Sequence, residues 1–234
     1  MLFFHNVKSI GYLQRVLEQY LISTLQNATN AQALSILFIL KQIVQTVTTL
    51  DLERLETYIQ TLSNLSLFQL SQLQIPIREL SKEFTLILEI VFYCSDLCKV
   101  LLDKLLVGVK KGDFNKEFFF ERNSFLQQII NFSEKILEID LTGNNIKIVS
   151  ISTLKEVDAL LNNTKKNAIK NLRMLLDFTF QFRDEYEHEF SEQQKAVVVT
   201  IIQTFTGFLK FFLTQIHSLV ALQFSVKTEF SVTV

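Results

Sequence analysis

The clearest indication of the fold class comes from residues 154–189, which read LKEVDALLNNTKKNAIKNLRMLLDFTFQFRDEYEHE. Apolar or small side chains recur along this stretch at steps of three and four. These positions are Leu154, Val157, Leu161, Thr164, Ala168, Leu172, Leu175, Thr179, Phe182 and Tyr186. Because an α-helix has 3.6 residues per turn, this spacing puts them on one face. We therefore predict a long amphipathic helix, with Lys155, Asp158 and Arg173 on its opposite, solvated face.

Helix-breaking residues are so scarce, with five Gly and one Pro, that each one marks a boundary. Pro76 suits a first helical turn, and Gly112 and Gly143 suit helix ends. Thr153 with Glu156 fits a capping box. The helices predicted from these marks and from periodicity span 7–26, 31–49, 52–62, 66–74, 76–111, 114–141, 154–189 and 192–226.

The predicted fold is all-α: one single-domain bundle over residues 1–234, with about seven or eight helices, four of them long. Shorter helices occupy 1–75, the four long ones occupy 76–226, and 227–234 form a tail. No linker rich in Gly, Ser or Pro signals a domain boundary.

The helix predicted over 76–111 carries a charge every seven residues. The charged positions are Lys82, Glu89, Asp96, Asp103 and Lys110. The rest of its circumference is mostly Leu, Ile, Val and Phe. A polar stripe this narrow indicates a helix that is covered by neighbours on most sides, with the charges facing solvent.

Composition excludes several classes of protein. Lys and Arg number 23 against 24 Asp and Glu, and a net charge of -1 disfavours binding to nucleic acid through its phosphates. Two cysteines cannot form a disulfide framework or a closed zinc site. The most apolar stretch, 196–226, is interrupted by polar residues that include Lys210 and His217, so no transmembrane span is predicted.

The sequence holds no set of residues that points to catalysis. It has three His and no Gly-rich phosphate loop, nucleophile elbow or HExxH motif, so we expect no enzyme and no cofactor. The lone Glu185-x-x-His188 pair is half of a di-metal motif, and we predict no metal site from it.

Four further residues with reactive or titratable groups have a structural interpretation. We expect Cys94 and Cys98 to be core residues without a disulfide. We expect Glu89 and Asp177, although flanked by apolar residues, to be surface carboxylates.

The unusual feature is phenylalanine, which occurs 22 times. Phe118, Phe119 and Phe120 are consecutive, and three consecutive helical residues span roughly 200° of the helix surface. One core face cannot take all three side chains. Two arrangements accommodate them: a multilayer helical core filled by aromatic side chains, or an apolar cavity or groove lined by phenylalanines from several helices. The functional prediction is the cavity. The candidate ligand-binding residues are Phe118, Phe119, Phe125, Phe182, Phe205, Phe208 and Phe212.

Three functions fit this surplus of apolar side chains. The first is a non-enzymatic bundle that binds an apolar, lipid-like ligand in the phenylalanine cavity. The second is a structural or interaction protein that self-associates into an oligomer through Phe-rich helix faces. The third is a membrane-active bundle whose helix 192–226 inserts on opening, so membrane contact is a further expectation.

The sequence leaves the compartment open. Its first residues lack the basic leader and cleavage site of a signal peptide, which predicts an intracellular protein unless the numbering starts at a processed form. Four Asn-x-Ser/Thr triplets would be glycan acceptors only in a secreted protein. They begin at Asn27, Asn64, Asn131 and Asn162.

Overall fold

The computed structural model describes residues 2–47, 51–73, 82–111, 124–139 and 151–186. It also describes Glu192, Lys195, Ala196, Val199, Ile202, Gln203 and Thr206. Over these residues it contains six bounded helices and no strand, which confirms the all-α prediction. The predicted total of seven or eight helices stays a prediction, and most of the helix predicted over 192–226 lies outside the described residues.

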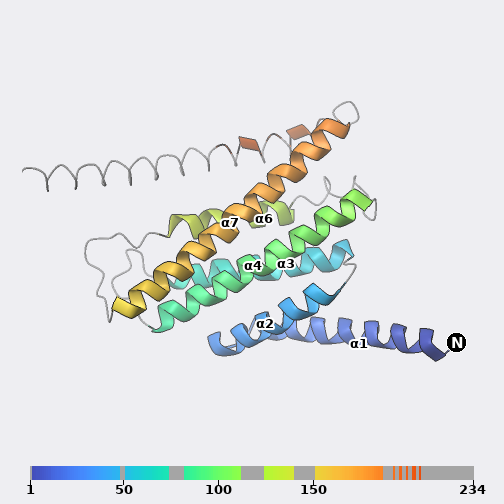
Figure 1. Cartoon of the computed structure of the whole chain (residues 1–234), viewed down its shortest axis with the longest axis horizontal. Coiled ribbons are helices and arrows are strands. Elements are labelled where there is room, and N and C mark those ends of the chain that lie inside the picture. The colour runs from blue at the N-terminus through green and yellow to red at the C-terminus, as the bar shows by residue number, and fades with distance from the viewer. Residues whose placement is uncertain are drawn as a thin grey trace, which may run out of the picture. The chain divides into compact units, whose positions relative to one another are not determined.

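The first two helices form a hairpin. Helix α1 (Leu2–Leu25) and helix α2 (Asn30–Thr46) contact each other and are joined by a short turn (Figure 1). Thr29 caps α2 in a capping box, because its hydroxyl accepts a hydrogen bond from the Gln32 amide and its own amide donates to Gln32 Oε1. This box was not among those predicted from the sequence.

Helix α3 (Leu52–Gln72) corrects the prediction of two helices over 52–62 and 66–74. No Gly or Pro occurs between them, so nothing breaks the backbone hydrogen-bond ladder. Leu62, Ser63 and Ser66 are all buried, so the supposed break lies inside the packed face of one continuous helix.

Helix α4 (Lys82–Lys111) lies at the centre of the described bundle. It contacts α2, α3 and helix α6 (Ser124–Glu138), and its buried side chains occur along most of its length. The prediction of a helix covered on most sides is confirmed. Pro76 and the predicted start of this helix lie outside the described residues.

Helix α7 (Ile151–Tyr186) packs against α4. Its buried positions include Val157, Leu161, Thr164, Ala168, Leu172 and Leu175, while Lys155, Asp158 and Arg173 are exposed. The predicted faces are therefore confirmed where side chains are described. The start is corrected, because α7 begins at Ile151 and Thr153 lies within the helix instead of capping it.

One apolar cluster ties four helices together near the beginning of α4. It contains Leu73, Phe84, Ile87, Leu88, Ile139, Val157 and Leu161. The cluster joins the ends of α3 and α6 to α4 and α7, and burial of this kind gives the packing most of its free energy. Farther along, the buried Asn171 side chain donates a 3.0 Å hydrogen bond to the Ser95 carbonyl.

Chain contacts separate two units, Met1–Phe178 and Thr179–Val234. The bundle described above belongs to the first unit, except for residues 179–186 of α7, which fall in the second. The single domain predicted over 1–234 stays a prediction.

Candidate functional site

The phenylalanines predicted to line a cavity lie outside the residues whose side chains are described. Phe125 and Phe182 fall within α6 and α7, but only their backbone is described, and the same holds for Glu185. Phe118, Phe119, Phe205, Phe208, Phe212 and His188 lie outside the described residues altogether. The predicted phenylalanine cavity therefore stays a prediction.

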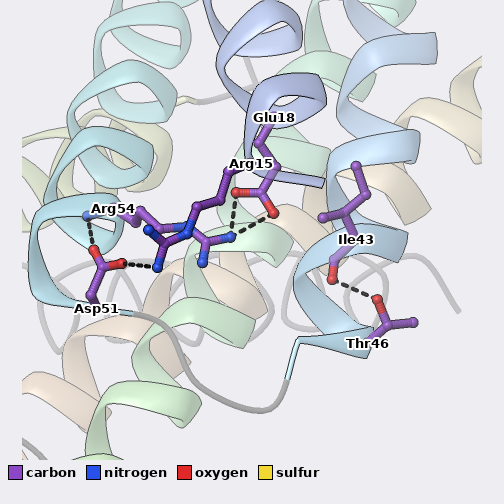
Figure 2. Close-up of polar contacts among 6 residues, drawn as sticks. All are labelled: Arg15, Glu18, Ile43, Thr46, Asp51 and Arg54. Carbon is purple, nitrogen blue, oxygen red and sulfur yellow. Dashed lines mark hydrogen bonds and ion pairs between the residues drawn. The ribbon is translucent and has the colours of Figure 1, made fainter. Parts of the chain in front are cut away.

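An ionic cluster joins α1 to the start of α3 (Figure 2). Arg54 Nη2 lies 2.7 Å from Oε1 and 2.5 Å from Oε2 of Glu18, whose side chain is almost fully buried. Asp51 caps α3 by accepting a 2.9 Å hydrogen bond from the Arg54 amide, and it also pairs with Arg15 at 3.4 Å. We call Arg15, Glu18, Asp51 and Arg54 the α1–α3 polar cluster.

Tyr58 completes the buried end of this cluster. Its hydroxyl is buried without a hydrogen-bond partner of good geometry, although the Glu18 carboxylate lies nearby. Burial, reinforced by the negative charge of Glu18, raises the pKa of Tyr58 well above its usual value. Tyr58 therefore stays a neutral phenol and supplies no base.

The charges of the α1–α3 polar cluster balance, with two guanidinium groups facing two carboxylates. The groove beside it holds about 220 Å³. Since each cation already has an anionic partner, the cluster offers no free charge to a ligand. We interpret it as a structural contact that fixes the orientation of α1 relative to α3.

A second ionic cluster lies between α2 and α4. Asp96 Oδ2 is 2.6 Å from Lys41 Nζ, and Lys99 binds the other carboxylate oxygen. Burial disfavours the charged carboxylate, but the hydrogen bonds from both lysines outweigh it and lower the pKa of Asp96. The expectation of an exposed charge stripe is wrong at Asp96, because α2 covers this turn and supplies Lys41.

An apolar groove adjoins that cluster. It holds about 570 Å³, and its walls come from α2, α4 and α7. It is lined by Leu34, Ser35, Phe38, Ile39, Glu89, Phe92, Tyr93 and Leu160. The rings of Phe92 and Tyr93 stack edge to face, with centroids 5.5 Å apart. We call it the α2–α4 groove.

The outward side of α1 is apolar and uncovered. Five large side chains there are between 45% and 69% exposed. They are Tyr12, Leu13, Val16, Leu17 and Tyr20, and we call them the α1 outer stripe. At 100° per residue they share one side of the helix, opposite the buried Glu18 and Leu25. Contiguous exposed apolar patches are uncommon on monomeric soluble proteins.

Neither cysteine is part of a reactive site. Cys94 and Cys98 are free and fully buried, as predicted, and burial raises the pKa of both thiols well above the ordinary value. The Asp177 side chain is exposed, which confirms the prediction of a surface carboxylate, and its Oδ2 lies 3.9 Å from Arg173 Nε. Glu89 is half-buried, at the α2–α4 groove.

The four asparagines of the glycan-acceptor triplets are exposed. Asn27 lies in the turn between α1 and α2, whereas the other three lie within helices. In those three triplets the hydroxyl residue, Ser66, Ser133 or Thr164, is fully buried.

Among the described residues, no three His, Cys, Asp or Glu side chains gather in a way that could hold a metal ion. Within the same residues, no helix has the length and apolarity needed to cross a bilayer. Comparison with family models, with curated proteins and with solved structures finds no match to the chain.

Proposed function

We propose that the protein is a non-enzymatic interaction protein that self-associates, with the α1 outer stripe as the contact surface. The observation that carries this proposal is the exposure of two tyrosines, two leucines and a valine on one side of one helix. Leaving so much apolar surface in water is costly, and contact with a second molecule removes the cost.

The spacing of the stripe suits a second copy of the same helix. Leu13, Val16, Leu17 and Tyr20 are spaced three, one and three residues apart, so their order is symmetric about the centre. An antiparallel partner related by a two-fold axis places Leu13 opposite Tyr20 and Val16 opposite Leu17. A two-fold contact requires a self-complementary surface of this kind.

The exposed area of the stripe and the charges beside it are compatible with a two-fold contact. The five side chains expose on the order of 500 Å², more than half of the ~800 Å² that each partner contributes to a typical interface, and flanking groups would have to supply the rest. The nearest charges on α1, Arg15 and Glu18, are paired with Asp51 and Arg54 away from the stripe. No like charges would therefore meet across the contact at these positions.

Light scattering with sedimentation equilibrium tests the proposal. The full chain should show a mass that rises with concentration from monomer to dimer. The double variant L13E/Y20E places carboxylates in the contact and should stay monomeric. Both side chains are about two-thirds exposed, so the fold and the helical circular dichroism should be retained.

A matched control comes from α3. Phe68 is 60% exposed and lines a groove with Ile22 and Gln26 of α1 but with none of the five stripe residues, so F68E should associate like the parent. A full chain that stays monomeric up to its solubility limit would contradict self-association. Association that survives L13E/Y20E would place the contact elsewhere.

Two other proposals remain. A lipid-like ligand in the phenylalanine cavity depends on side chains outside the described residues, and native mass spectrometry of the purified protein tests it. Membrane activity depends on residues 192–226, and liposome leakage measured across pH tests that.

A further inference from the structure

The α2–α4 groove has the size and lining of a site for a small apolar chain. Its volume of about 570 Å³ lies within the range of ligand sites, roughly 300–1,000 Å³. Phe38 and Ile39 on its α2 wall are 53% and 42% exposed, although both are apolar. The opposite wall offers the rings of Phe92 and Tyr93, and Leu160 closes the side toward α7.

The wall of the groove at Tyr93 adjoins a surplus positive charge. Lys41 Nζ lies 6.0 Å from the centroid of the Tyr93 ring. Lys41 and Lys99 share the single carboxylate of Asp96, which leaves a formal charge of +1 in a cluster that is largely removed from water. An ammonium group this shielded attracts an anion more strongly than a freely solvated lysine does.

The groove also contains a negative group. Glu89 precedes Asp96 by seven residues, which is about 10 Å along the helix. It would repel a second anionic group on a ligand, so a molecule with one charged end fits and a molecule charged at both ends does not.

We propose that the α2–α4 groove binds a long-chain monocarboxylate, with its hydrocarbon chain along Phe38, Phe92 and Leu160 and its carboxylate beside Lys41. A single surplus positive charge matches a monoanion. The site is independent of the α1 outer stripe, because the two surfaces use different helices.

Fluorescence titration with a C18 polyene fatty acid and with its methyl ester tests the site on the full chain. The acid should bind saturably and about tenfold more tightly than the ester, because only the acid carries the charge that Lys41 attracts. In K41M, where Asp96 keeps Lys99, the acid should lose that advantage and the ester should bind as before.

The variant F38A should weaken the acid and the ester alike, because it removes an apolar wall that both chains use. F68A is the matched control, since it removes an exposed phenylalanine outside the groove. Thermal melts followed by circular dichroism should show that all three variants fold.

Three results would overturn the proposal: no saturable binding of the acid, equal binding of acid and ester by the parent, or equal losses in F38A and F68A. Binding by the monomeric L13E/Y20E variant separates this site from self-association. That variant should bind the fatty acid with unchanged affinity.

Discussion

A buried aspartate is stable in α4 because two lysines reach it from different directions. Lys99 comes from the next turn of the same helix, and Lys41 comes from α2. Removing Asp96 leaves both lysines in a low dielectric without a carboxylate partner, which costs more than the intact cluster contributes. Asp96 therefore links α2 to α4 as long as it is ionised.

This predicts how the stability of the protein changes with pH. The pKa of Asp96 is lower in the folded chain than the ordinary aspartate value of 3.8, so the stabilisation from its charge is complete above that pH. The contribution is lost as the pH falls through the depressed folded-state pKa. D96N should lower the free energy of unfolding by about 2 kcal/mol at neutral pH.

Urea unfolding between pH 7 and pH 3 measures this effect. The difference between the parent and D96N should shrink once the pH drops below about 4. D103N, on an exposed turn of the same helix, should behave like the parent throughout. A D96N deficit that stays constant down to pH 3 would show that its charge is not the cause.

At the scale of the elements, the α1–α3 polar cluster combines a helix cap with two interhelical ion pairs. Asp51 accepts from the Arg54 amide at the first turn of α3, and the Arg54 side chain reaches the buried Glu18 of α1. The two arginines hold α1 beside α3 (Figure 2).

Replacing Asp51 separates its role as a cap from its charge. D51A should destabilise the protein by about 1 kcal/mol, because the amide of Arg54 loses its acceptor. D51N keeps a capping oxygen and loses only the exposed pair with Arg15, so it should retain most of the stability. Urea midpoints of the two variants measure the difference. Equal losses in D51A and D51N would assign the stability to the ion pair.

At the scale of the whole molecule, the described bundle is organised around α4. Cys94 and Cys98 both lie on this helix and are fully buried. A reagent can reach them only when the helices around α4 separate. Their reactivity therefore reports on opening of the bundle, not on local motion.

Thiol labelling with a chromogenic disulfide tests this. In native buffer both thiols should react slowly, at rates that rise with urea in parallel with unfolding followed by circular dichroism. In fully denaturing urea two thiols per chain should react at once. Rapid labelling of either cysteine in native buffer would contradict the central position of α4.

The sequence alone determined that the described residues are helical, because helical periodicity depends only on the order of apolar and polar residues along the chain. That order predicted which side chains of α7 are buried and which are exposed, and it predicted that neighbouring helices cover most of α4. The break expected between 62 and 66 did not occur, because tertiary burial of Ser63 and Ser66 favours a continuous α3.

Only the tertiary structure decided which polar residues are buried and which apolar residues are exposed. Glu18, Asp96 and Asn171 look like surface residues in the sequence, and their partners Arg54, Lys41 and the Ser95 carbonyl are 36, 55 and 76 positions away. The exposure of Tyr12 and Tyr20 depends in the same way on which helices lie beside α1. Periodicity defines the faces of each helix, but the packing between helices determines which face meets water and which meets a distant charge.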